Sequence, residues 1–272
     1  MKWEELTASD FQQSVPLCGR VCLLPIGVLE KHGDALPLGQ DAIYAHEVSV
    51  RAAESEPAMV FPQYVFGQIA EARQQPGTVA IRAELLFALL ENLCDEIARN
   101  GLNRIILVSG HGGNGGLLSF FLRSLLEKNK PYLVFQYFAM DAAGIRPGVL
   151  ASQNDGHAGE YELSIMMALR PELVKDGGMP ADYGLPLGRL AAFRQCKLGT
   201  PVDWYADHPG HLAADRVPGT AEKGCIIMDY EANRLAEAIR LVKADDTPLR
   251  LYREYCDRAV RPNANDGVVS EA

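Results

Sequence analysis

The sequence lacks an excess of basic residues, and it contains no basic run. Its 26 Lys and Arg are outnumbered by 35 Asp and Glu, which gives a formal net charge of −9 at pH 7. Nucleic acids and anionic membrane surfaces are bound through clustered Lys and Arg. We therefore expect neither a nucleic acid nor a membrane as a partner.

Cysteine motifs and long apolar runs are also missing. The six cysteines are scattered and form no C-x-x-C pair, so the sequence indicates neither a disulfide framework nor a thiolate zinc site. Any metal would have to be held by nitrogen and oxygen ligands. No apolar stretch approaches a membrane-spanning length, and the first residues do not have the pattern of a signal peptide. We therefore expect a cytoplasmic protein.

The composition is ordinary for a folded protein, with 48% hydrophobic and 22% charged residues. A chain of 272 residues is longer than the commonest domain, yet α/β folds of this size often form one unit. We predict a single domain over residues 1–258 and a flexible C-terminal tail over residues 259–272.

Short apolar runs alternate with amphipathic segments along the chain. Strands are predicted at residues 21–26, 59–66, 104–109 and 132–138, and helices at 42–53, 83–100, 117–128 and 220–242. This alternation predicts a three-layer α/β/α fold with a largely parallel sheet. Residues 171–219 are rich in Gly and Pro and are interpreted as long loops or a lid. Ligands of such folds usually bind at the carboxyl ends of the strands.

The first candidate site follows the first predicted strand. Glu30, His32 and Asp41 lie within twelve positions, and this mixture of carboxylates and imidazole suits a divalent metal ion. Glu30 and His32 would point to opposite sides of an extended segment, so a kinked loop or two metals would be required. Asp41 is our choice for a bridging ligand. A solvated loop with an Asp at a helix start explains the segment equally well.

The second candidate site is the glycine-rich turn at residues 109–116. Its Gly110-x-Gly112-x-x-Gly115 pattern formally matches a dinucleotide-binding fingerprint, with Asp141 as a distant candidate for the ribose-binding acid. That alternative predicts a nicotinamide-dependent oxidoreductase. In the interpretation that we favour, the glycines allow a tight turn that projects His111 over the edge of the sheet.

The third candidate site is the segment that contains His157, Glu160 and Glu162. A histidine and two acids at a glycine-bearing helix start suit metal ligation and proton transfer. Acids at a helix start are more often partners of the helix dipole than ligands. Three such segments in one chain favour a common site.

Together these motifs resemble the creatininase (creatinine amidohydrolase) family across most of the chain. The matching segments are Pro25-Ile26-Gly27-x-x-Glu30-x-His32-Gly33, Leu36-Pro37-Leu38-Gly39-x-Asp41, Pro76-Gly77-Thr78, Gly110-His111-Gly112-Gly113-Asn114, His157-Ala158-Gly159-Glu160-x-Glu162 and Thr220-Ala221-Glu222-Lys223-Gly224. Each motif is modest alone, but their order and spacing are specific. The family also includes formamide deformylases and a peptidase of mycofactocin maturation.

The resemblance implies a two-metal centre and a set of site residues. The implied metal ligands are Glu30, His32, Asp41, His111 and Glu160, with Asp41 bridging the ions, and the implied catalytic residues are His157 and Glu162. Creatininase takes its last carboxylate ligand two residues after the histidine that matches His111, where this chain has Gly113. Glu160 is therefore the expected replacement, with Glu162 as the second choice.

The resemblance also implies the function. We expect hydrolysis of a C–N bond in a small amide (a cyclic amide, a formamide or a peptide-like compound) by a water that two Zn, Mn or Fe ions activate. A homo-oligomer, a hexamer in this family, is expected. The chain has only two tryptophans, Trp3 and Trp204, whereas creatininase lines its pocket with them, so creatinine itself is a doubtful substrate. The candidate lid residues are Trp204, Tyr205, His208 and His211, with Arg73 and Gln74 as weaker pocket candidates.

Overall fold

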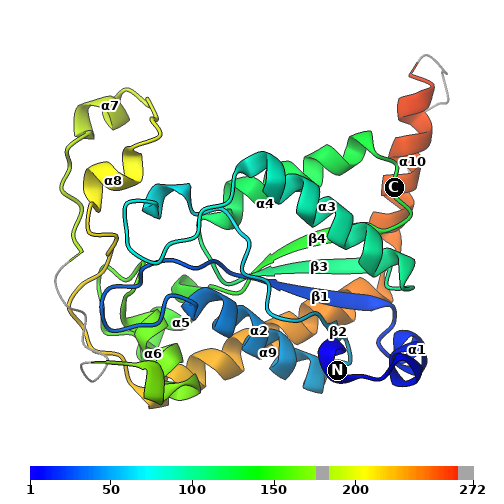
Figure 1. Cartoon of the computed structure of the whole chain (residues 1–272), viewed down its shortest axis with the longest axis horizontal. Helices are drawn as coiled ribbons and strands as arrows, with labels where there is room; N and C mark the ends of the chain where they lie inside the picture. The colour runs from blue at the N-terminus through cyan, green and yellow to red at the C-terminus, as the bar shows by residue number, and fades with distance from the viewer. Residues whose placement is uncertain (176–183, 263–272) are drawn as a thin grey trace.

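The computed structural model describes residues 1–175 and 184–262. In these ranges the sheet has four parallel strands in the order β2-β1-β3-β4 (Figure 1). Their bounds are β1 Val21–Ile26, β2 Met59–Val60, β3 Arg104–Ser109 and β4 Leu133–Phe138. Each residue of β1 pairs in register with one of β3, from Val21 opposite Arg104 to Ile26 opposite Ser109.

Helices cover both faces of this sheet, as the alternation of apolar runs predicts (Figure 1). The helices are α1 Ala8–Leu17, α2 Gln40–Ser55, α3 Ala83–Arg99, α4 Asn114–Ser124, α5 Ala142–Val149, α6 Glu160–Leu169, α7 Ala191–Gln195, α8 Asp203–Asp207, α9 Ala221–Ala244 and α10 Thr247–Val260. Short 3-10 turns occupy Trp3–Glu5, Ala70–Ala72, Leu125–Glu127 and Pro171–Leu173. No described helix is both long and apolar enough to cross a membrane.

Alternate residues of β1 bury their side chains on opposite faces of the sheet. Val21 and Leu23 pack with helices α2, α6 and α9, whereas Cys22 and Leu24 pack with α3 and α4. This period of two follows from strand geometry, and burial on both faces explains the uninterrupted apolar run. The predicted three-layer α/β/α fold is confirmed.

The second predicted strand is too long. The strand predicted at residues 59–66 pairs only at Met59–Val60, with an isolated bridge between Tyr64 and Ile26. Pro62 lacks the N–H that a longer ladder needs.

The single domain over residues 1–258 and the flexible tail over residues 259–272 stay predictions. Residues 259 and 260 belong to helix α10, whose Tyr252 and Cys256 are buried and whose Tyr252 hydroxyl donates to the Leu125 carbonyl. Residues 263–272 lie outside the described residues.

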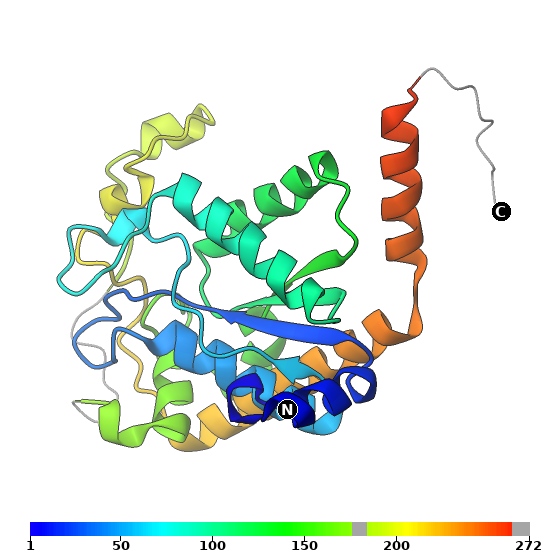
Figure 2. The same cartoon turned by 45° about the vertical axis from the view of Figure 1, so that its right-hand side comes forward.

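Two parts of the chain project from the body. Helix α10 extends away at one end, and α7 and α8 form an arm over residues 184–212 at the other (Figure 2). The arm lies on the side of the molecule to which the carboxyl ends of the central strands lead (Figure 1). It therefore stands next to the edge where the candidate residues gather.

Candidate metal centre

Glu30, His32 and Asp41 converge at the carboxyl end of β1. The first two lie on the loop after β1, and Asp41 lies in the first turn of α2. His32 Nε2 lies 3.0 Å from Asp41 Oδ1 and 3.9 Å from Glu30 Oε1, and all three residues are at most 1% exposed. The loop is therefore kinked, so that Glu30 and His32 face the same point.

A glycine allows this loop to pack on the start of α2. A Cβ at Gly27 would clash with the backbone of Asp41 and Ala42. Only a residue without a side chain permits this approach.

His111 joins the cluster from the end of β3. Its Nδ1 lies 2.8 Å from Glu30 Oε1 and 3.2 Å from Asp41 Oδ2. Its Nε2 donates a hydrogen bond of 2.9 Å to the Gln68 carbonyl, which leaves the lone pair of the neutral ring on Nδ1. The imidazole is therefore oriented with its free nitrogen toward the two carboxylates, as metal-ligating histidines usually are.

Glu162 completes a second group of potential ligands. It lies in the first turn of α6, and its Oε2 is 3.8 Å from His32 Nε2. Two sets of three potential ligands result, namely Glu30, Asp41 and His111, and His32, Asp41 and Glu162, with the ligand atoms of each set within 4.8 Å of one another. Asp41 belongs to both sets, since each of its two oxygens faces a different histidine.

The charges of this cluster fit divalent cations. Burial raises the pKa of Glu162 to about 8. Burial acts to lower the pKa of His32, but the charges of Asp41 and Glu162 outweigh it and raise the pKa to about 10. Within the described residues, the buried Glu30 Oε1 and Asp41 Oδ2 accept no hydrogen bond. Positive charge is therefore favoured at this point, and the nitrogen and oxygen donors fit zinc, manganese or iron.

Glu160, the predicted last ligand, is placed elsewhere. Its carboxylate accepts hydrogen bonds from the backbone N–H groups of Ala151 and Ser152 and forms an ion pair with Lys223. Positions 160 and 162 are two apart on a helix, so their side chains differ in direction by roughly 200°. Glu162, the second choice from the sequence, is the acid that faces the cluster.

The glycine at position 113 also has a structural reason. A Cβ there would clash with His111 Nε2 and would lie 2.9 Å from Glu71 Oε1. No side chain at position 113 can reach the cluster without displacing these groups. The carboxylate of the second set therefore comes from α6 and not from this turn.

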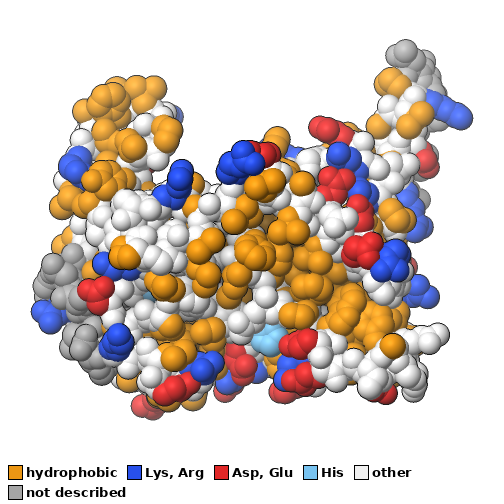
Figure 3. Space-filling view, viewed as in Figure 1, with side chains coloured by type: hydrophobic (Ala, Val, Ile, Leu, Met, Phe, Trp, Pro, Cys, Tyr) orange, Lys and Arg blue, Asp and Glu red, His pale blue; other side chains and the backbone are white. Residues whose placement is uncertain are grey.

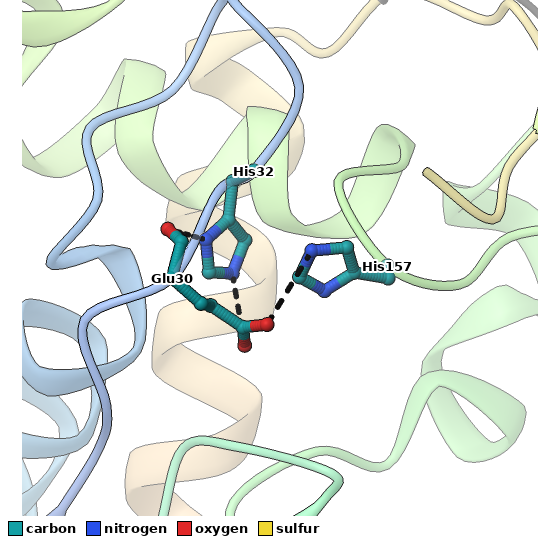
Figure 4. Close-up of side chains that lie close together, drawn as sticks. All are labelled: Glu30, His32 and His157. Atoms are coloured by element: carbon teal, nitrogen blue, oxygen red, sulfur yellow. Dashed lines mark hydrogen bonds and ion pairs between the residues drawn. The ribbon is translucent and has the colours of Figure 1, made fainter. Parts of the chain in front are cut away.

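His157 lies beside the cluster, with its ring centroid 4.4 Å from that of His32 and the Glu30 carboxylate facing both rings (Figure 4). Its Nε2 is 3.7 Å from Glu30 Oε2 and donates a hydrogen bond of 2.7 Å to the Lys31 carbonyl. Burial, followed by the charge of His32, lowers the pKa of His157 well below its ordinary value. Its ring is therefore neutral at pH 7 and can accept a proton at Nδ1. Glu30, His32 and His157 also form a third set of potential ligands.

A cavity of about 370 Å³ opens onto these residues. Its walls include the ligand candidates Glu30, His111 and Glu162, together with Glu71, Met140, Tyr161, Trp204 and His211. Trp204 and His211, two of the lid candidates, are thus brought to the site. Tyr205 is 45% exposed, and Arg73 and Gln74 are exposed and do not line the cavity.

Sequence reasoning missed Glu71, Met140 and Tyr161 as wall residues. Glu71 lies only two positions before Arg73, so the sequence indicates the correct loop but points to the wrong residue in it. Tyr161 reaches the cavity from the first turn of α6. Its position between Glu160 and Glu162 in the sequence does not indicate that it lines a cavity.

The dinucleotide alternative finds no support in the geometry. Asp141, its candidate ribose-binding acid, accepts hydrogen bonds from Tyr230 Oη at 2.9 Å and from Arg234 Nη1 at 2.7 Å. It does not line the cavity that Gly112 and Gly113 help to form. His111 uses this turn to reach Glu30 and Asp41, which the alternative leaves unexplained.

Fold and site together define an α/β/α protein with a candidate metal centre at the carboxyl edge of a parallel sheet. Residues 4–239 match the family model Creatininase, described as creatinine amidohydrolase. The chain belongs to the creatininase family. As a member of this family, it is a hydrolase that acts on C–N amide bonds.

Individual relatives agree with this assignment. The chain is 27% identical to creatinine amidohydrolase of Pseudomonas putida, over 87% of this chain and 95% of that protein. It is 28% identical to the mycofactocin precursor peptide peptidase of Mycolicibacterium smegmatis, over 80% and 87% of the two chains. A solved manganese form of creatininase is 25% identical, with a TM-score of 0.71 over 90% of this chain and 99% of that one.

Proposed function

We propose that this chain hydrolyses a C–N bond of a small amide by means of two divalent metal ions. One ion would be held by Glu30, Asp41 and His111, and the other by His32, Asp41 and Glu162. The observation that carries the proposal is the position of Asp41, because its Oδ1 faces His32 and its Oδ2 faces His111. A carboxylate shared in this way is typical of two-metal sites.

The metals and the protein would divide the chemistry between them. Bound divalent ions supply Lewis acidity, which lowers the pKa of water and polarises a carbonyl group. The chain itself orients the ligands, because the Gln68 carbonyl fixes the ring of His111. The manganese form of creatininase supports a metal-dependent reaction, and the ligand set is compatible with Zn, Mn or Fe.

His157 would transfer the proton that the attacking water loses to the leaving nitrogen. The Lys31 carbonyl accepts from Nε2 of this histidine, so Nδ1 is the nitrogen that can take up and return a proton. Its lowered pKa keeps the ring unprotonated at neutral pH, so Nδ1 retains its lone pair. Glu162, expected from the sequence to be catalytic, is assigned here to metal binding.

The cavity supports a small substrate. Its volume of about 370 Å³ lies at the lower end of ordinary ligand pockets. Trp204, Tyr161 and Met140 supply apolar walls, and Glu71 supplies a carboxylate on the rim of the glycine-rich turn. A cyclic amide, a formamide or the end of a short peptide would suit this space.

Two measurements test the proposal. The protein is purified without chelators, its metal content is determined, and cyclic amides, formamides and short peptides are then screened by release of amine or acid. We expect turnover only with metal present, restored after chelation by adding Mn²⁺ or Zn²⁺. Stoichiometric nicotinamide dinucleotide binding without metal dependence would refute the proposal.

We further propose a homo-oligomer, with six subunits by family resemblance, in the cytoplasm. Exposed hydrophobic side chains on the projecting parts support an assembly: Leu187 and Phe193 of the arm are 59% and 55% exposed, and Val260 of α10 is 77% exposed (Figure 3). Sedimentation velocity would test the stoichiometry, with a monomer as the contradicting result.

A further inference from the structure

A hydrogen-bonded chain connects the arm to the candidate metal centre. Trp204 Nε1 donates to His211 Nδ1 at 2.8 Å, and His211 Nε2 lies 2.5 Å from Glu30 Oε2. Trp204 belongs to α8 and His211 follows it on the same arm. His211 is 2% exposed and Glu30 is fully buried. Both side chains line the cavity, yet His211 belongs to none of the three sets of potential ligands within the described residues.

The indole of Trp204 determines which nitrogen of His211 carries the proton. An indole N–H can only donate, so His211 Nδ1 must accept. In the neutral ring the hydrogen is then on Nε2, which donates it to Glu30 Oε2. A nitrogen that carries hydrogen cannot bind a metal ion. His211 is therefore a donor to a ligand and not a ligand itself.

The bond from His211 also determines how Glu30 is presented. It occupies Oε2, whereas Oε1 is buried, accepts no hydrogen bond in the described chain and lies 2.8 Å from His111 Nδ1. Oε1 is the oxygen that faces the first set of ligands. Carboxylate ligands are commonly held by such hydrogen bonds from outside the ligand set.

The backbone of His211 supports a specific role for its side chain. Its φ of +56° lies in the left-handed region, which is unfavourable for residues other than glycine. A residue in this conformation is retained where its surroundings require it, often at functional sites. The ring is also fixed by aromatic neighbours, with its centroid 4.4 Å from that of His157 and 5.6 Å from that of Trp204.

We infer that His211 is a positioning residue, oriented by Trp204, which holds Glu30 so that Oε1 is directed at the first metal ion. The arm then completes the metal centre as well as lining the cavity. This inference rests on the proposed function, because it assigns Glu30 to a bound ion.

The test measures metal affinity and needs no substrate. Mn²⁺ is titrated into chelator-treated protein, and free Mn²⁺ is followed by electron paramagnetic resonance. His211→Leu removes the donor, whereas His211→Gln keeps an amide N–H close to the position of Nε2. Trp204→Phe keeps an aromatic ring and removes only the N–H. The matched controls are Trp3→Phe, at the other tryptophan, and His46→Leu, at a histidine that does not line the cavity.

We expect His211→Leu to weaken binding of one of the two ions by about 10- to 100-fold, the usual effect of losing such a support. His211→Gln should restore most of the affinity, and Trp204→Phe should weaken it about fivefold, as for one lost hydrogen bond. The controls should bind as the wild type does. Circular dichroism verifies that each variant is folded.

Results that refute the positioning role can be distinguished from a result that refutes the proposed function. If His211→Leu or, where that variant does not fold, Trp204→Phe binds both ions with wild-type affinity, the positioning role is wrong and the proposed function stands. The same holds if His211→Gln is as weak as His211→Leu, because packing and not the donor is then responsible. If the wild type itself binds no metal, the proposed function fails and this inference falls with it.

Discussion

Replacing each of the two acids at the start of α6 by Gln tests the proposal that Glu162 is a metal ligand and Glu160 a structural carboxylate. Glu160 and Glu162 are two residues apart and equally well buried, at 0% and 4% exposure. Their carboxylates face different partners, Lys223 for the first and His32 for the second. We therefore expect Glu160→Gln to lower stability and Glu162→Gln to lower metal binding.

The magnitudes follow from the partners of each carboxylate. Glu160 accepts from two backbone N–H groups and pairs with Lys223, which is only partly buried. Weakening these charge-assisted bonds should lower the free energy of unfolding by about 2–4 kcal/mol. For a chain of this length, that corresponds to a decrease in Tm of roughly 5–10 °C.

Glu162 should behave in the opposite way. Burial raises its pKa to about 8, so the acid is largely neutral in the metal-free protein and a neutral Gln changes stability little. A second metal ion that loses one of three protein ligands should bind at least about 100-fold more weakly, since even residues behind the ligands contribute 10- to 100-fold.

The assay compares both variants side by side. Thermal unfolding is measured in chelator, and metal content is measured by mass spectrometry after loading with Mn²⁺ and dialysis. Glu160→Gln should melt earlier and keep both ions, whereas Glu162→Gln should melt normally and keep one. The reverse pattern, with metal lost from Glu160→Gln and retained in Glu162→Gln, would refute the assignment.

Two further predictions concern the histidines. His157→Gln should retain both ions and reduce kcat by about 10²- to 10⁴-fold, the usual contribution of a proton-transfer residue; loss of an ion would instead make His157 a ligand. In the metal-free protein, the folded pKa of His32 is raised to about 10, above its unfolded value. The protonated ring therefore contributes stability that is fully present below pH ~6.5 and lost as pH rises through about 10. Urea unfolding in chelator should show this decline in stability between pH 7 and 10. Mn²⁺-loaded protein, whose His32 is already neutral, should not show it. A chelator-treated protein that is equally stable at both pH values would contradict this prediction.

Much of the fold could be predicted because the central strands are buried on both faces. The runs at residues 21–26 and 104–109 are apolar without interruption, and the structure has β1 and β3 at those positions. The strand predicted at residues 59–66 is longer than β2, because apolar character alone does not indicate that Pro62 lacks the N–H a longer ladder needs. Helix α10 was missed because its residues are mostly polar and exposed.

The convergence of Glu30, Asp41 and His111 could be predicted because parallel strands bring their carboxyl ends to one edge. The choice between Glu160 and Glu162 could not, because it depends on the rotation of α6 and on Lys223, which lies 63 positions along the chain from Glu160. The bond from His211 to Glu30 spans 181 positions. No local pattern indicates a contact of that kind, so His211 could be predicted only as a lid candidate.

The central claim is that Asp41 belongs to two metal ions at once, and the metal content of Asp41→Asn tests it most directly. The exchange keeps the size of the side chain and removes its charge, so neither set of ligands retains its shared carboxylate. We predict two Mn²⁺ per wild-type chain, none retained by Asp41→Asn after dialysis, and amide hydrolysis reduced by roughly a thousandfold or more, as for a lost Lewis-acid contribution of about 4 kcal/mol. An Asp41→Asn protein that keeps both ions, or a wild type that never binds more than one, would contradict the account.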